Sequence, residues 1–298
     1  MRLGLVINPT AGGAKGEKVG QQVRDRLAQT ENSVLELSAG SLEAARENCQ
    51  RAINEGIIDV LIVVGGDGMA HLGVNVCAEK NVSLAIVPAG TGNDSAGILG
   101  MPLDDPIRAI ELILENLDDP KRIDALSIVH GDNHTWAFGT ASAGFDALVN
   151  RRANAMSWPN GPSRYYLAML LELARFKPIT YKATIDGEAK EFEAMLCVVS
   201  NSGVFGGGML VVPDASVQDD LLDLLIVKRM TRQKLVAIFP RVYKGTHVSD
   251  PAVEILRAKQ IFIEAEGMPI YSDGEYVGQA PFRATIVPSC LSVIAPAL

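Results

Sequence analysis

Features of membrane-spanning, disulfide-bonded and dinucleotide-binding proteins are scarce in this sequence. No apolar run approaches the length of a bilayer crossing, and the stretch from Met1 to Pro9 is typical of a first strand and not of a signal peptide. The four cysteines are far apart and form no Cys-x-x-Cys pair, which indicates reduced, buried thiols. No Gly-x-Gly-x-x-Gly follows the first predicted strand, which argues against a Rossmann dehydrogenase. We therefore expect a cytoplasmic protein without disulfides.

An excess of positive charge is also missing. The formal net charge is −8, which disfavours a nucleic-acid partner. Any membrane contact would then depend on apolar residues or on a local patch, not on a polybasic segment. Hydrophobic residues make up 48% of the 298 residues, and glycine and proline are present in ordinary amounts. This composition predicts a globular protein, most simply one with two domains.

The most informative stretch is a buried-looking strand, Leu61 to Val64, that leads into Gly65-Gly66-Asp67-Gly68. Glycines remove the β-carbons that would keep a charged ligand away from the backbone N–H groups. A predicted helix follows through Ala70 to Val76, and its N-terminus adds partial positive charge at the same place. The sequence therefore predicts a phosphate site, in which the Asp67 carboxylate would hold a cation or take a proton.

The first 120 or so residues alternate between strand and helix patterns. Helical spacing follows the first two strands, and Ser41 is placed to cap the second helix. This order predicts a parallel sheet with crossover helices, in which ligands lie at the carboxyl ends of the strands. The predicted strands are 3–7, 34–37, 61–64 and 83–88.

A second polar loop, Ala89-Gly90-Thr91-Gly92-Asn93-Asp94, follows the strand that ends at Pro88. By itself this loop is equally typical of a tight turn followed by a helix cap. Two such loops on consecutive strands favour a binding site. The next helix is predicted to begin near Pro106, since proline is favourable in a first helical turn.

Near Arg122 the pattern changes to alternating or apolar runs without regular helices between them, which predicts an antiparallel, sandwich-like second domain. Asp186-Gly187 has the chemistry of a hairpin turn. One helix is expected at 163–176, and its apolar stripe favours core packing over a lipid groove. The predicted strands are 125–129, 135–139, 179–185, 193–199 and 221–227.

Three stretches of this second part could carry chemistry. Residues 200–209 are rich in glycine and suit close approach to a ligand, although an edge or bulge would look the same. The acidic stretch 213–223 could hold a divalent cation or be a charged loop. Ser272-Asp273-Gly274-Glu275 is, without context, a common turn with a solvated acid.

These motifs together resemble the diacylglycerol kinase catalytic-domain family, which includes soluble bacterial lipid kinases and the sphingosine and ceramide kinases. The resemblance spans nearly the whole chain. It implies an α/β nucleotide-binding domain over 1–123, like that of phosphofructokinases and NAD kinases, to which 286–298 returns. It also implies an antiparallel β-sandwich acceptor domain over 124–285. The motifs that carry it are Gly65 to Gly68, Pro88 to Asp94, Phe205 to Met209 with Pro213 to Ala215, and Asp273 to Glu275.

The resemblance also implies roles for individual residues. Asp67 would serve ATP-bound Mg²⁺ or the reacting hydroxyl, and Glu275 would be the general base. A structural magnesium would be held by Ser216, Asp219 and the Leu221 carbonyl. The implied ATP-binding residues are Asn8, Ser38, Gly65, Gly66, Gly68, Gly90, Thr91, Asn93 and Asp94.

Three positions depart from the family pattern. Met69 replaces a threonine or leucine, and Leu72 replaces a glutamate, while His71 stands where an asparagine or histidine is expected. Asp220 replaces the glycine of the metal loop, which adds a charge and a β-carbon and puts the metal geometry in question.

The sequence thus leads to the hypothesis of an ATP- and Mg²⁺-dependent kinase that phosphorylates diacylglycerol or a similar lipid. Its expected partner is a lipid substrate at the membrane surface, where the protein would bind peripherally, with no nucleic acid and with a homodimer left open. One alternative is a small-molecule kinase of the NAD-kinase or phosphofructokinase type. Another is a non-catalytic nucleotide-binding regulator, for which Leu72 and Asp220 are the motivation.

Overall fold

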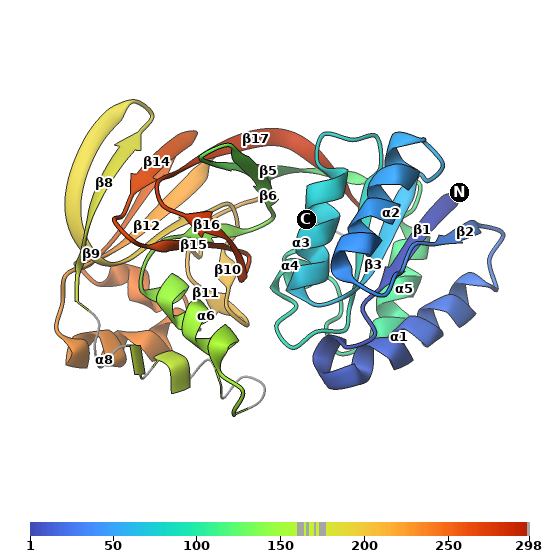
Figure 1. The fold of residues 1–298 in the computed structure, drawn as a ribbon, viewed down its shortest axis with the longest axis horizontal. Coiled ribbons are helices and arrows are strands. Elements are labelled where there is room, and N and C mark those ends of the chain that lie inside the picture. Colours follow the sequence, from blue (N-terminus) through green and yellow to red (C-terminus); the bar gives the residue numbers. More distant parts are fainter. Residues whose placement is uncertain (160–163, 165–166, 170, 173–176, 297–298) are drawn as a thin grey trace. The chain divides into compact units, whose positions relative to one another are not determined.

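The computed structural model describes residues 1–159, 164, 167–169, 171–172 and 177–296 (Figure 1). The chain divides into two compact units. The first comprises Met1–Ala125 and Pro288–Leu298, and the second comprises Leu126–Val287. Much of the predicted helix at 163–176, including Tyr166, Leu170 and Ala174, lies outside the described residues.

The first unit is built on a parallel sheet, as predicted. Its strands lie in the order β2, β1, β3, β4, and the C-terminal end of β17 pairs in parallel with the far side of β4. Strands β3 and β4 are buried throughout, which explains their unbroken apolar runs. The strands are β1 (Arg2–Ile7), β2 (Ser33–Glu36), β3 (Val60–Gly65) and β4 (Ser83–Pro88).

Helices follow the strands of this sheet (Figure 1). α1 packs against α5, and α2 packs against α3. Ser41 caps α2 as predicted, because its side chain accepts a hydrogen bond from the Ala44 N–H at 3.2 Å. Asp105 caps α5 in the same way, with Pro106 in the first turn. The helices are α1 (Ala11–Leu27), α2 (Leu42–Asn54), α3 (Asp67–Cys77), α4 (Asp94–Ile98) and α5 (Pro106–Glu115).

The second unit is mainly antiparallel, which confirms the predicted fold class. Its central strands lie in the order β16, β15, β7, β9, β8, β14, β17, while β12 pairs with β9 and β13, and β5 pairs with β6 and β17. Asp186 and Gly187, with φ of 46° and 91°, form the predicted hairpin turn between β8 and β9. The strands are β5 (Lys121–His130), β6 (Asn133–Ala137), β7 (Thr140–Ser142), β8 (Ile179–Ile185), β9 (Glu188–Ser200), β10 (Val204–Phe205), β11 (Met209–Leu210), β12 (Leu222–Lys228), β13 (Val253–Ala258), β14 (Gln260–Glu264), β15 (Pro269–Ser272), β16 (Glu275–Gln279) and β17 (Phe282–Val293).

The expectation that this part contains no regular helix outside 163–176 was wrong. The structure has α6 (Phe145–Ala155), α8 (Arg232–Val242) and the short 3₁₀ helix η1 (Thr246–Ser249). Thr231 caps α8 by accepting a hydrogen bond from the Lys234 N–H at 3.2 Å. Within the described part of the chain, no helix is long and apolar enough to cross a membrane.

All four cysteines are free and buried, as the sequence indicated. Burial raises the pKa of the Cys49 thiol to about 12 and that of the Cys290 thiol to about 11. These thiols are therefore protonated at neutral pH and pack as small apolar side chains.

Candidate active site

Three loops of the first unit meet at the carboxyl ends of β1, β3 and β4. The backbones of these loops lie in close contact. The space that a Cβ atom would need at two of their glycines shows how close they are. A Cβ added at Gly90 would lie 2.4 Å from the Gly66 Cα, and one added at Gly12 would lie 2.4 Å from the Ala89 carbonyl oxygen. The structure thus brings the two glycine-rich loops of the sequence together, and glycine is required where they touch.

Packing inside the first unit, and not only access for a ligand, explains the glycine at position 65. A Cβ at Gly65 would lie 2.4 Å from the Met69 Cγ, and Met69 is itself buried. Met69, a departure from the family pattern, therefore fills the space beneath the turn. Gly66 and Gly68 are only half-buried, so their backbone remains accessible to a ligand.

Asp67 joins the two loops. It is the first residue of α3, and its Oδ1 accepts a hydrogen bond from the Ser95 N–H at 3.0 Å, in the first turn of α4. A Cβ at Gly92 would lie 2.8 Å from the other carboxylate oxygen. Gly66, the N-cap of α3, has no side chain to cap the helix, so the first turn of α3 presents N–H groups at a partly positive helix end.

The remaining residues of the second loop differ in role. Asn93 is buried in a left-handed conformation with φ of 60°. Its Oδ1 accepts from the Gly90 N–H at 2.8 Å, and its Nδ2 donates to the Gly90 carbonyl at 3.2 Å. Asn93 therefore shapes the loop. Thr91 is exposed, and Asp94 is half-buried at the first position of α4.

Asn8 and Ser38 lie at the ends of β1 and β2. The Asn8 Oδ1 accepts from the Thr10 N–H at 3.1 Å and from the Thr10 hydroxyl at 2.8 Å, which forms a local turn. The Ser38 hydroxyl accepts from the last backbone N–H of β1 at 2.9 Å and donates to Glu36. Both side chains thus have structural partners at the edge where the sequence placed the nucleotide.

The contacts around Glu36 escaped the sequence interpretation. Arg24 of α1 lies 2.8 Å from the Glu36 carboxylate. Burial alone would raise the pKa of Glu36, but hydrogen bonds from Arg24 and Ser38 outweigh it and hold the pKa below its ordinary value. The spacing of these three residues along the chain follows no local motif, so no signal in the sequence would have linked them.

In the second unit, Glu275 begins β16 with an exposed side chain. The turn before it is anchored by Asp273, whose carboxylate accepts three backbone N–H groups. The distances are 2.6 Å to Phe138, 2.9 Å to Gly139 and 2.8 Å to Thr140. A carboxylate that accepts several N–H groups is held firmly, so Asp273 fixes the position from which Glu275 projects.

The buried stretch Ser200 to Ser202 meets the same corner of the second unit. The Asn201 N–H donates to the Gly139 carbonyl at 2.7 Å, and the Asn201 Nδ2 donates to the Phe138 carbonyl at 3.1 Å. A Cβ at Gly139 would lie 2.8 Å from the Ser202 Oγ. Two stretches singled out in the sequence, 200–209 and 272–275, therefore share one polar junction.

The acidic loop holds an arginine. The Asp219 carboxylate pairs with Arg257 and also accepts from the Leu221 N–H at 3.2 Å, while Arg257 lies 3.2 Å from the Asp223 carboxylate. Ser216 accepts a hydrogen bond from Gln218 at 3.3 Å. Among the residues that the structure describes, no three Cys, His, Asp or Glu side chains are grouped to hold a metal ion. Arg257 therefore pairs with Asp219 in this structure, and magnesium binding by Ser216, Asp219 and the Leu221 carbonyl stays a prediction.

The first unit is a parallel α/β sheet with glycine-rich loops suited to binding phosphate, and an antiparallel β unit follows it in the chain. This arrangement is that of a class of nucleotide-dependent kinases. Residues 2–128 match the model of the diacylglycerol kinase catalytic domain. Residues 139–295 match the YegS C-terminal NAD kinase beta sandwich-like domain. The chain belongs to the diacylglycerol kinase family, whose members are phosphotransferases with an alcohol acceptor.

Individual relatives agree with this assignment in sequence, and a solved structure agrees with it in fold. A diacylglycerol kinase of Mycobacterium tuberculosis is 36% identical over 295 residues, which cover 98% of this chain and 94% of that protein. One from Bacillus subtilis is 26% identical over 288 residues, covering 94% and 91%. A solved diacylglycerol kinase structure from Bacillus anthracis superposes with a TM-score of 0.72 at 23% identity, covering 99% of this chain and 96% of that one. The predicted family, fold class and enzyme class are confirmed, and a kinase of this family uses ATP.

Proposed function

We propose that this protein transfers the γ-phosphate of ATP to the hydroxyl of diacylglycerol or of a similar lipid. The observation that carries the proposal is the contact between Gly66 and Gly90, which sets two accessible loops beside the uncapped N-terminus of α3. The acceptor is inferred from relatives that are named diacylglycerol kinases.

The first unit would hold ATP. Backbone N–H groups at Gly66 and Gly68 would bind phosphate oxygens, with the positive end of α3 behind them. The exposed Thr91 hydroxyl would add a donor and Asp94 would line the nucleotide site, while Gly65, Gly90 and Asn93 keep the loops in place. Asn8 and Ser38 would line the nucleotide site.

The chemistry would need two carboxylates. Mg²⁺ bound with ATP supplies charge neutralisation during phosphoryl transfer, and Asp67 is the residue that would hold it. Glu275 would accept the proton of the lipid hydroxyl as that oxygen attacks phosphorus. Its exposed carboxylate, on a turn that Asp273 anchors, suits this role.

Radiolabelled ATP with mixed lipid micelles tests the proposal. Separate micelles would carry diacylglycerol, monoacylglycerol, a sphingoid base and a glycolipid, and detergent-free reactions would contain NAD or fructose 6-phosphate. We expect labelled diacylglycerol product, which falls by at least about a hundredfold in Asp67→Asn and Glu275→Gln. Glu264→Gln, an exposed glutamate of β14 in the same unit as Glu275, is the matched control.

Unchanged turnover in Glu275→Gln would overturn its role as base. Product only from a soluble acceptor would favour the small-molecule kinase. ATP binding with no transfer to any acceptor would favour the non-catalytic regulator.

A further inference from the structure

Helix α8 of the second unit carries apolar side chains on the side that faces solvent. Val236 and Tyr243 are each 51% exposed, and Pro240 is also exposed. Phe239 is half-buried and packs edge-on against Tyr243, with ring centroids 6.2 Å apart. Spacings of three, four and seven residues place these side chains in one row along the helix.

The opposite side of α8 already supplies its contact with the core. Leu235 and Val242 pack against buried residues that include Val198 and Val212, and Ile238 is buried. The exposed apolar row is therefore not needed to hold α8 in the fold. Single exposed apolar residues are common, but an aligned row on one helix is the pattern of a surface that meets something apolar.

The charged residues at the two ends of this row are both positive. From Leu224 to Ser249 the chain has no Asp or Glu, although its net charge is −8. Arg232 and Lys244, both exposed, lie at the two ends of the row. The other basic residues of this segment have acidic partners: Lys228 pairs with Glu254, Arg229 with Glu193, and Lys234 and Arg241 with Asp250.

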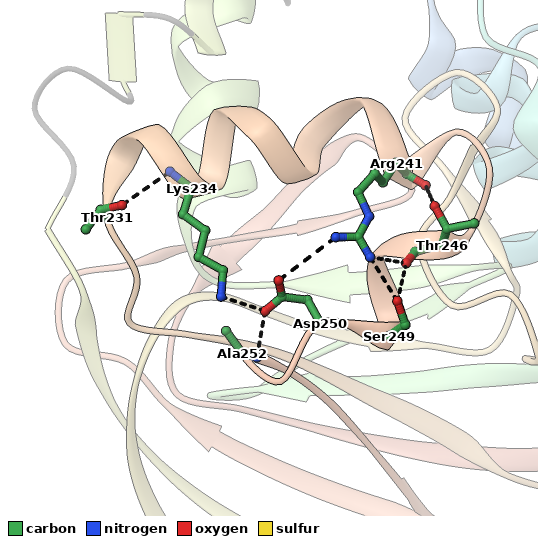
Figure 2. A network of polar contacts seen from close by, with 7 residues as sticks. All are labelled: Thr231, Lys234, Arg241, Thr246, Ser249, Asp250 and Ala252. Atoms are coloured by element: carbon green, nitrogen blue, oxygen red, sulfur yellow. Dashed lines mark hydrogen bonds and ion pairs between the residues drawn. The ribbon is translucent and has the colours of Figure 1, made fainter.

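A polar network fixes the orientation of α8 (Figure 2). Lys234 and Arg241 lie 2.8 Å and 4.0 Å from the Asp250 carboxylate. Arg241 also donates to the Thr246 carbonyl at 2.6 Å and to the Ser249 hydroxyl at 2.9 Å. The hydrogen bond from Lys234 leads the effects that hold the pKa of Asp250 below its ordinary value, so the carboxylate is charged at neutral pH. Contacts near both ends therefore hold α8 in place, and its apolar row faces solvent.

We propose that the α8 row, defined as Arg232, Val236, Phe239, Pro240, Tyr243 and Lys244, rests on the headgroup region of a bilayer that contains anionic lipid. Aromatic and aliphatic side chains would enter the interface, and the flanking cations would meet lipid phosphates. This docking surface rests on the proposed function, because a bilayer is where a diacylglycerol kinase would find its substrate.

Charge decides between a membrane and a second copy of this chain. Two α8 rows facing each other would bring Arg232 and Lys244 of one copy near the same two cations of the other, and the row itself contains no acid. An anionic bilayer offers both the apolar layer and the opposite charge. The local patch also resolves how an acidic protein could bind a negatively charged membrane.

Vesicle sedimentation in the absence of ATP tests the inference. Vesicles of phosphatidylcholine alone and of phosphatidylcholine mixed with phosphatidylglycerol would be used, at low and high salt. We expect the protein to bind the mixed vesicles, less at high salt, and Val236→Asp/Tyr243→Asp to reduce binding at least about tenfold. Leu42→Asp/Ile57→Asp, exposed apolar residues of the first unit, should bind as wild type.

A second readout separates membrane docking from loss of folding or of catalysis. Val236→Asp/Tyr243→Asp should retain the wild-type melting temperature and wild-type turnover of a short-chain, monomeric diacylglycerol, but should phosphorylate vesicle-borne diacylglycerol at least about tenfold more slowly. The wild-type protein could bind vesicles, and the variant lose that binding, while neither phosphorylates any lipid. That outcome would support the docking surface and overturn the proposed function. Equal binding by variant and wild type would overturn the docking surface. So would a dimer that the variant abolishes, without any binding to vesicles.

Discussion

Gly90 shows how a single missing methyl group can shape a nucleotide loop. Gly90 lies so near to Gly66 that the glycine-rich motifs after β3 and β4 pack directly against each other. Both motifs therefore need glycine for packing, whether or not a ligand is bound. The sequence indicated glycine at these positions because of phosphate binding. The structure adds a packing requirement that depends on two strands lying side by side, which no local pattern reports.

Gly90→Ala should therefore destabilise the first unit and remove ATP-dependent turnover. The new Cβ would meet backbone at 2.4 Å, and overpacking of this kind costs about 1–3 kcal/mol. Gly97→Ala is the matched control, since its Cβ would meet the Leu103 side chain at an ordinary 3.8 Å. Thermal unfolding and ATP titration would compare the two variants. Equal stability in both would contradict the packing role of Gly90.

Asp273 is a positioning residue that the sequence motif conceals. Asp273-Gly274 is a common turn, and nothing within it reveals that the carboxylate accepts three N–H groups from a segment more than 130 residues earlier. Such contacts arise only when β7 and β15 pair.

Asp273→Ala should lower turnover through Glu275 and also reduce stability. Buried N–H groups left without an acceptor cost about 1–3 kcal/mol, and the turn before Glu275 would lose its anchor. We expect kcat to fall at least about tenfold with little change in the KM for ATP. Asp132→Ala, in the exposed turn between β5 and β6, should match wild type. A normal kcat in a destabilised Asp273→Ala protein would show a purely structural role.

At the level of elements, sequence patterns were most reliable where a strand was an unbroken apolar run, as in β3 and β4. The capping residue Ser41 and the first-turn residue Pro106 were also predicted correctly. Helix α8 was missed because it is apolar on two sides and contains Pro240, so its helical period is blurred. Helix α6 was missed because its buried residues are two alanines and Asn150, which give a weak apolar signal.

In the acidic loop at 216–223 the structure shows contacts with an arginine that the sequence did not indicate. Arg257 bridges Asp219 and Asp223, and Asp223 is almost fully buried. The sequence suggested oxygen ligands for a metal, since the arginine lies on β13, more than 30 residues away. The left-handed conformation of Asp220, with φ of 61°, also shows that this position keeps the backbone of a glycine.

Chelation should consequently leave the melting temperature of the protein unchanged. Arg257→Gln should lower stability by roughly 1–3 kcal/mol, because two neighbouring carboxylates would lose their cation while the exposed guanidinium limits the effect. Arg283→Gln provides a control arginine on β17. Thermal unfolding with EDTA and with added Mg²⁺ is the measurement. A marked loss of stability with EDTA in the wild-type protein would mean that the loop holds a metal ion.

On the scale of the whole molecule, the chain leaves the first unit at Ala125 and returns to it at Pro288. The returning segment pairs in parallel with β4 through Ser292 and Val293, and the Ile294 N–H donates to the Leu84 carbonyl at 2.9 Å. Ile294 is 1% exposed. The first unit is therefore completed by residues that follow the whole of the second unit in the chain.

Ile294→Ala should accordingly weaken the first unit, although it lies near the end of the chain. Truncation of a buried isoleucine costs about 2–5 kcal/mol. Hydrogen exchange resolved by segment should show faster exchange in β3 and β4 and unchanged exchange in β9 and β12, together with weaker ATP binding. Ile57→Ala, an exposed isoleucine of the first unit, should leave both measurements at wild-type values. Faster exchange confined to β9 and β12 would instead mean that the C-terminal segment stabilises the second unit.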